Sequence, residues 1–152
     1  MAFHGVCALW SAWRRRVFAS QVERALTAAP RGGAPRDVLT LDAVSTTMRL
    51  SWTARPVHPW DRDLPCEQQD AAFADQCLLD VDVAMARLFA KFPAVERLDI
   101  TVRRPGSGTP ILTGTAHRAD FERVRRLSTP MRLKMVGLAY ELGRGGLRPL
   151  PE

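Results

Sequence analysis

The sequence predicts an α+β fold, with an antiparallel sheet built from successive hairpins and helices packed on one face. Two observations predict it. Segments with the two-residue apolar alternation of half-buried strands occur in pairs joined by short turns. Segments with the three- and four-residue apolar spacing of helices lie between those pairs. The expected order of elements is α-ββ-α-ββ-α-ββ, and 152 residues are enough for one hydrophobic core.

The first expected element is an amphipathic, basic helix over about residues 5–28. Pro and Gly then dominate residues 30–36, and both residue types oppose helix continuation. We therefore expect an N-terminal helix over residues 1–29, a linker over residues 30–36 and a single α+β domain over residues 37–152. The apolar positions that predict the helix are Val6, Leu9, Trp10, Trp13, Val17, Val22, Ala25 and Leu26.

The first strand pair follows the linker. Leu39 and Leu41 alternate with polar residues, and the same alternation runs from Met48 to Ala54, so two strands joined around residues 43–46 are expected. A long helix then starts near Asp63 or Pro65 and ends before Pro93. Its apolar stripe consists of Phe73, Cys77, Leu78, Val81, Met85, Leu88, Phe89 and Phe92.

A second hairpin is expected over residues 98–116, because Pro105-Gly106-Ser107-Gly108-Thr109 supplies turn residues between two alternating segments. Gly114 indicates a bulge or a close backbone approach in the second of these strands. Asp120 is expected to cap a short helix, and Thr129-Pro130 to start another turn. A last pair of extended segments, about residues 138–142 and 147–150, flanks a glycine-rich turn.

The net charge of +6 is unevenly distributed along the chain. Residues 1–36 carry six Arg and one Glu, residues 61–92 carry seven acids and three bases, and residues 119–152 carry seven bases and four acids. One acidic helix is thus expected between basic flanks. Arginine outnumbers lysine 20 to 2, which a GC-rich genome explains as readily as a selection for phosphate binding.

Three widely spaced cysteines, Cys7, Cys66 and Cys77, fit free thiols in a reducing compartment better than disulfides or a structural zinc site. The apolar run from Ala2 to Trp13 is too short to span a bilayer, and its basic residues follow it instead of preceding it. These features predict a cytoplasmic location without export or a transmembrane anchor.

The segment from Arg55 to Cys66 holds an imidazole, carboxylates, an indole and a thiol between two regular elements. In the simplest interpretation its prolines shape the exit from a strand, Trp60 covers the edge of the core, and Asp61 or Asp63 caps the acidic helix. His58, Asp61, Asp63 and Cys66 also form an H-x₂-D-x-D-x₂-C spacing, which matches no structural zinc pattern. We assign no metal ligand, no cofactor and no catalytic residue.

A thiol-dependent or metal-dependent enzyme centred on residues 58–66 remains an alternative. Cys66 near a helix N-terminus and His58 is compatible with a thiolate, but the neighbouring carboxylates oppose its formation. His117-Arg118 with Asp120 also ends a strand, where a solvated strand terminus is the simpler interpretation.

Nucleic-acid binding is a second alternative. It would use arginines that neutralise phosphates if they met on one face, although no aromatic residues are interleaved with them for base stacking. The candidates are Arg14, Arg15, Arg16, Arg103, Arg104, Arg123, Arg125 and Arg126.

The preferred hypothesis is a non-catalytic protein-interaction subunit or adaptor of a larger assembly. The N-terminal helix carries a heavy apolar load and either packs on its own domain, docks on a protein partner or contacts an anionic membrane peripherally. A protein partner or a homo-oligomer is expected. The proposed partner-binding residues are Trp10, Trp13, Phe18, His58, Trp60, Asp61 and Asp63.

Overall fold

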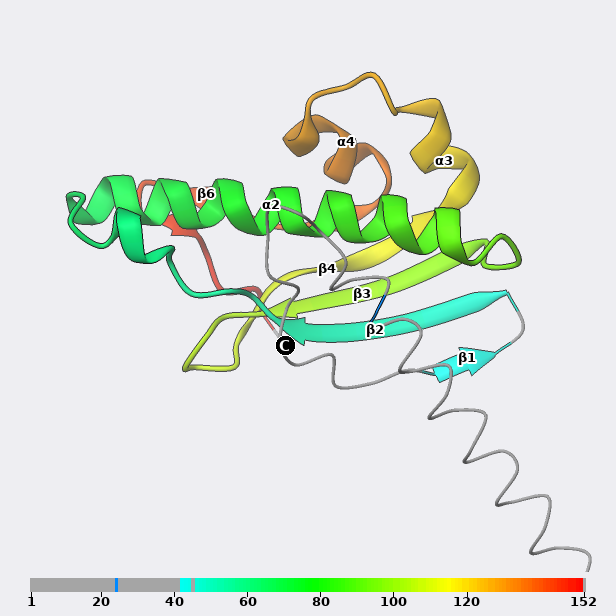
Figure 1. Ribbon diagram of the computed structural model, residues 1–152, viewed down its shortest axis with the longest axis horizontal. Helices are drawn as coiled ribbons and strands as arrows, with labels where there is room; N and C mark the ends of the chain where they lie inside the picture. The colour runs from blue at the N-terminus through cyan, green and yellow to red at the C-terminus, as the bar shows by residue number, and fades with distance from the viewer. Residues whose placement is uncertain (1–23, 25–41, 45, 152) are drawn as a thin grey trace, which may run out of the picture.

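The computed structural model describes residue 24, the backbone of residues 42–44, and residues 46–151 (Figure 1). The expected N-terminal helix, apart from Arg24, and the linker over residues 30–36 lie outside the described residues. So do Trp10, Trp13, Phe18 and Arg14–Arg16, and those assignments remain predictions.

A mixed sheet forms the centre of the described domain, with the strand order β1-β2-β3-β4-β5. The antiparallel pairs are β1–β2, β3–β4 and β4–β5, and the β3–β4 pair is the hairpin expected over residues 98–116. The β1–β2 pair differs from the expected first hairpin, because β1 occupies part of the expected connection over residues 43–46, while Leu39 and Leu41 lie outside the described residues. The strands are β1 (Asp42–Val44), β2 (Thr47–Thr53), β3 (Arg97–Arg103), β4 (Pro110–His117) and β5 (Leu138–Ala139).

The expectation of a wholly antiparallel sheet is wrong, because β2 and β3 pair in parallel along their full lengths. The reason is the connection between them. Helix α2 (Cys66–Lys91) runs back across the sheet, so the chain re-enters β3 at the same end where it entered β2. Two adjacent hairpins joined by one return helix must meet through a parallel pair.

Helix α2 confirms the prediction of a long acidic helix with one apolar face. Its 26 residues span about 39 Å, whereas the seven residues of β2 span about 23 Å. The helix is therefore longer than the strands that it covers, and its N-terminal turns extend beyond the end of β2 (Figure 1). This overhang positions the site described below.

The C-terminal third departs from the expected order. Two short helices, α3 (Arg118–Arg123) and α4 (Thr129–Met135), stand where one helix and a turn were expected. The final extended pair is instead three short strands. β5 joins the main sheet, while β6 (Leu142–Gly143) and β7 (Gly146–Leu147) form a separate hairpin.

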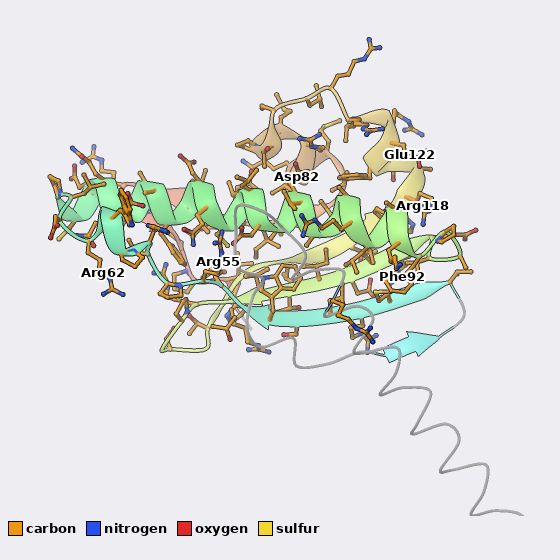
Figure 2. All side chains as sticks on the ribbon, viewed as in Figure 1. Arg55, Arg62, Asp82, Phe92, Arg118 and Glu122 are labelled. Atoms are coloured by element: carbon orange, nitrogen blue, oxygen red, sulfur yellow. The ribbon has the colours of Figure 1, made fainter. Side chains whose placement is uncertain are left out.

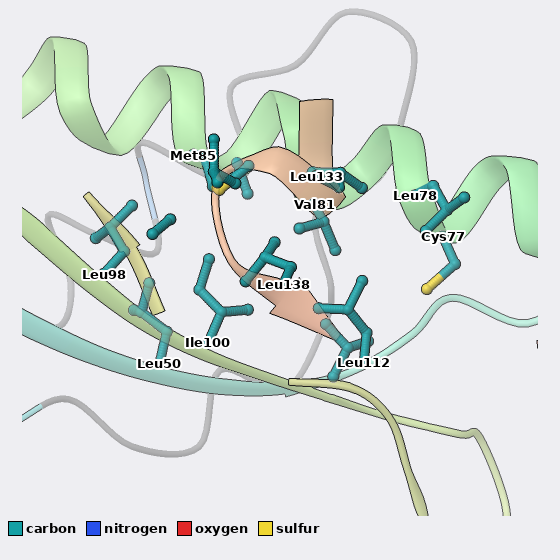
Figure 3. Close-up of a cluster of buried hydrophobic side chains, with 14 of the residues drawn as sticks. Leu50, Cys77, Leu78, Val81, Met85, Leu98, Ile100, Leu112, Leu133 and Leu138 are labelled. Atoms are coloured by element: carbon teal, nitrogen blue, oxygen red, sulfur yellow. The ribbon is translucent and has the colours of Figure 1, made fainter. Parts of the chain in front are cut away.

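The hydrophobic core lies between α2 and one face of the sheet. The alternating apolar positions of β2 and β3 point toward the helix, and the apolar stripe of α2 points back toward them (Figure 3). The described helices α2, α3 and α4 lie on the same side of the sheet, as the sequence predicts (Figure 1). The most completely buried residues are Met48, Leu50, Trp52, Leu78, Met85, Leu88, Leu98, Ile100, Ile111, Leu112, Leu133 and Leu147.

The opposite strand positions carry polar side chains that bond across the sheet. Asp99 lies between Arg49 of β2 and Thr115 of β4 in the register, and it accepts hydrogen bonds from Thr115 Oγ1 at 2.7 Å and from Arg97 Nε at 3.0 Å. Burial tends to raise the pKa of Asp99, but these hydrogen bonds and the charges of Arg97 and Arg49 outweigh it and lower that pKa.

Gly114 marks a close backbone approach, one of the two outcomes that the sequence indicates. A Cβ on Gly114 would lie 2.3 Å from the backbone oxygen of Gly137, just before β5. Gly137 itself has φ +99 and would bring a Cβ to 2.8 Å from the backbone oxygen of Thr115. Two glycines therefore let β5 pack against β4.

Candidate functional site

The segment between β2 and α2 begins with a strong attachment to the helix. Arg55 donates Nε to Asp80 Oδ2 at 2.8 Å and Nη2 to Asp80 Oδ1 at 2.6 Å, and both side chains are mostly buried. Gln76 Nε2 also reaches the backbone oxygens of Arg55 and Pro56, at 3.5 and 3.4 Å. A bidentate guanidinium–carboxylate pair fixes orientation as well as distance, so the chain leaves β2 in a defined direction (Figure 2).

Residues 58–64 then form a compact turn around a short 3-10 helix, η1 (Pro59–Asp61). The backbone N–H of Asp61 donates to His58 O at 2.9 Å, and the N–H of Trp60 donates to His58 Nδ1 at 3.3 Å. Gln69 Nε2 of α2 donates to the backbone oxygens of Arg62 and Leu64, at 2.8 and 2.7 Å. The turn is held from within and from the helix beside it.

Trp60 stands on this turn with 84% of its surface exposed. The expectation that its indole covers the edge of the core is therefore wrong. Val57 packs against the core from this segment instead. The Trp60 ring faces His58 with their centroids 6.3 Å apart and their planes at 50°. A large indole in water, on a turn with so many backbone attachments, is the least expected feature of the described surface.

Capping of α2 by Asp61 or Asp63 is also wrong. The N-cap is Pro65, which makes no side-chain cap hydrogen bond, and Asp61 belongs to η1. Gln69 orders the approach to the helix by bonding to the carbonyl groups of the turn, a role that the sequence did not signal. Asp120 likewise does not cap α3, whose N-cap is His117; Asp120 lies in the first turn and pairs with Arg123 at 3.5 Å.

His58 and Cys66, the two proposed reactive groups, lie at the starts of two different helices, η1 and α2. Cys66 is exposed as the first residue of α2, while the His58 ring engages Trp60. Within residues 46–151, no group of three or more His, Cys, Asp or Glu side chains could hold a metal ion. We define the Trp60 segment as residues 56–65, and its prominent chemical feature is an exposed indole beside carboxylates.

The five described arginines of the nucleic-acid alternative are split between two ends of the sheet. Arg97 pairs with His117 in the antiparallel β3–β4 register, so Arg103 at the other end of β3 lies far from α3, which begins at Arg118. Arg104 turns inward: its guanidinium lies over the Phe73 ring at 5.6 Å and bonds to Leu147 O. Arg123, Arg125 and Arg126 are exposed after β4.

Sequence analysis missed a second exposed apolar group, at α4. Met131 and Met135 are 54% and 60% exposed, and Leu127 before the helix is 39% exposed. The four-residue spacing of the two methionines within a basic stretch was the available signal. We define the α4 surface as these apolar residues and the exposed basic residues around them, Leu127, Met131, Met135, Arg123, Arg125, Arg126 and Lys134.

Arg118 also has a structural role that its sequence position did not indicate. Its guanidinium bonds to three backbone carbonyl oxygens at the end of α2 and in the turn that follows, those of Phe89, Phe92 and Val95. Arg118 is therefore an internal brace, whereas His117 at the same strand end is exposed, as expected for a solvated terminus.

No helix in the described part of the chain is both long and apolar enough to cross a membrane. Comparison with protein-family models, with curated protein sequences and with solved structures finds no significant match. Functional inference therefore rests on the chemistry and geometry of the two surfaces.

Proposed function

We propose that this protein is a non-catalytic interaction subunit, or adaptor, and that the Trp60 segment is one of its contact surfaces. The observation that carries the proposal is the 84% exposure of an indole on a turn fixed by hydrogen bonds. Tryptophan is enriched among the residues that dominate binding energy at protein interfaces.

The fixed geometry of the segment supports the same proposal. A side chain presented on an ordered turn loses less conformational entropy on binding than one on a mobile loop. The attachments that order this turn come from Arg55, Gln76 and Gln69, all of which bond outside the exposed indole. They hold the segment in place without covering the surface that a partner would contact.

The experiment is co-purification of the tagged full chain from its native host, comparing wild type, Trp60→Ala and the control Leu142→Ala. Leu142 is also an exposed apolar residue, at 53%, but it belongs to β6. We expect a companion protein that Trp60→Ala loses and Leu142→Ala retains, since removal of a central aromatic weakens an interface by about 2 kcal/mol, or roughly thirtyfold.

Retention of the same companions by Trp60→Ala would contradict the proposal. A nucleic-acid companion that moderate salt releases and that Trp60→Ala retains would favour the alternative based on Arg123, Arg125 and Arg126. Thiol-dependent or metal-dependent turnover lost on His58→Ala or Cys66→Ala would instead favour the enzyme alternative.

A further inference from the structure

The α4 surface is exposed because the rest of α4 is held firmly against the domain. Leu133 is completely buried, and Arg132 Nη2 pairs with Asp82 Oδ2 of α2 at 2.9 Å. Tyr140 donates its hydroxyl to the backbone oxygen of Pro130 at 2.8 Å. With these inward contacts made, Met131 and Met135 are left side by side on the outward face of the helix.

The charges around these methionines are predominantly positive. Residues 122–135 contain five basic residues and one Glu, a net charge of +4. Arg132 forms a salt bridge with Asp82, but Arg125, Arg126 and Lys134 remain exposed. Such a surface disfavours pairing with an identical copy of itself, because the basic rims would face each other. It fits an apolar side chain that is surrounded by carboxylates.

The Trp60 segment and the first turns of α2 have that complementary chemistry. Residues 61–75 contain five acids and one Arg, a net charge of −4, and Asp63, Glu67 and Asp75 are exposed in the segment that follows Trp60 along the chain. Methionine thioethers make favourable contacts with aromatic rings and adapt to their shape. An indole with an acidic surround therefore matches two methionines with a basic surround.

The two surfaces cannot meet within one molecule. The α4 helix is tied to α2 at Asp82, whereas the Trp60 segment enters α2 at Cys66, about 24 Å away along the helix. Figure 1 shows them on different sides of α2, with η1 near the N-terminal end and α4 over the middle of the helix. Contact between them requires a second copy.

We propose that the α4 surface is the docking site for the Trp60 segment of a second copy of this chain, in a head-to-tail arrangement. The inference rests on the proposed function, because it names the partner of the same Trp60 segment. In a heterologous contact each copy uses a different surface, so one copy retains a free Trp60 segment and the other a free α4 surface. Each pair therefore still has one free Trp60 segment and one free α4 surface, which can bind further copies or other proteins.

The test is sedimentation velocity of the purified full chain over a range of concentrations, with wild type, Trp60→Ala, Met131→Glu and the control Leu142→Glu. Met131 and Leu142 are 54% and 53% exposed, so the two glutamate substitutions are matched in exposure and charge. We expect wild type and Leu142→Glu to self-associate, increasingly so at low salt. Trp60→Ala and Met131→Glu should each weaken association by about tenfold or more.

The decisive measurement mixes the two weakened variants in equal amounts. Trp60→Ala retains an intact α4 surface and Met131→Glu retains an intact Trp60 segment, so the mixture should form a 1:1 dimer that does not grow further. Circular dichroism of each variant checks that it is folded; if Met131→Glu is not, Met135→Glu replaces it at the same surface.

Three results would overturn the inference: a wild-type chain that stays monomeric, association that neither substitution weakens, or a mixture of folded variants that remains monomeric. Binding of a monomeric chain to phosphatidylserine vesicles, lost in Met131→Glu, would assign the α4 surface to an anionic membrane instead. A chain that is monomeric when pure but retains a Trp60-dependent companion from its host would remove this inference and leave the proposed function standing.

Discussion

The guanidinium of Arg118 lies 4.8 Å from the centroid of the Phe89 ring, and its Nη1 donates a 2.8 Å hydrogen bond to the backbone oxygen of the same residue. Its other nitrogens donate to the backbone oxygens of Phe92 at 2.8 Å and of Val95 at 2.6 and 2.9 Å. One side chain at the start of α3 thus satisfies carbonyl groups at the end of α2 and in the turn before β3 (Figure 2).

Arg118→Ala is therefore expected to lower the free energy of unfolding by about 3 kcal/mol, because it leaves several carbonyl groups without their charged donor. Arg118→Lys should lose less stability than Arg118→Ala, because its ammonium group can still donate to some of these carbonyl groups. The measurement is equilibrium unfolding in urea. Arg123→Ala is the control, since its 76% exposed side chain should contribute about 0.5 kcal/mol or less. Equal losses of unfolding free energy for Arg118→Ala and Arg123→Ala would contradict the bracing role of Arg118.

Asp82 should make the protein more stable as the pH falls. Burial raises the pKa of Asp82, and the charge and hydrogen bond of Arg132 offset this only in part. The folded state therefore disfavours the ionised carboxylate, and this cost disappears as the pH falls through the raised pKa toward the unfolded value. The free energy of unfolding of wild type relative to Asp82→Asn should increase between about pH 7 and pH 4. A relative decrease over that range would contradict the direction of the shift.

Asp99 should behave in the opposite way. Its lowered pKa means that the ionised form contributes stability above the unfolded value, and that this contribution is lost as the pH falls through the lowered pKa. Asp99→Asn is expected to be less stable than wild type at neutral pH, with a difference that narrows below about pH 4. NMR titration of the Asp99 carboxyl carbon measures the pKa directly, and a value above that of an unstructured Asp would be incompatible with the network around it.

Gly146 lets the β6–β7 hairpin contact the backbone of α2. Its φ is +78, and a Cβ there would lie 2.7 Å from the backbone oxygen of Asp70. Gly106 has a similar φ of +83 but open space around it. Alanine at Gly106 therefore measures the cost of backbone strain without steric overlap. We expect Gly106→Ala to cost about 1 kcal/mol of unfolding free energy and Gly146→Ala about 3 kcal/mol. Similar losses at the two positions would mean that the hairpin moves away from α2 without cost.

The two described cysteines should differ sharply in reactivity. Burial, followed by the nearby Asp80 carboxylate, raises the pKa of Cys77 to about 12, although the charge of Arg104 acts against this. Cys66 is exposed. In a Cys7→Ser background, a thiol reagent at mildly alkaline pH should modify Cys66 in the folded protein and Cys77 only after unfolding in urea. Modification of both thiols at one rate in the native state would contradict the burial of Cys77.

Sequence periodicity predicted the elements better than their assembly. The stripe from Phe73 to Phe89 identified α2, and the alternations around Leu50 and Ile100 identified β2 and β3, because burial on one face leaves a regular spacing in the chain. The predicted antiparallel pairing of β2 and β3 was wrong. Pairing direction depends on the path of the intervening helix across the sheet, which no local spacing records.

The sequence identified the segment that holds the candidate site, but it did not predict the contacts of the side chains there. The sequence singled out the segment around Trp60 because of its residue types, yet the expected core contact and aspartate caps were both wrong. Exposure of the indole depends on Gln69 and Arg55 holding the turn from α2, and these contacts join residues up to 25 positions apart.

By itself the sequence determined the fold class, the acidic helix with its apolar face and the β3–β4 hairpin, since these follow from side-chain periodicity and turn chemistry along neighbouring residues. Only the tertiary structure decided the parallel β2–β3 pair, the outward indole of Trp60 and the exposed methionines of α4. Each of these depends on which distant groups compete for the same space, as when Arg132 pairs with Asp82 and leaves Met131 in solvent.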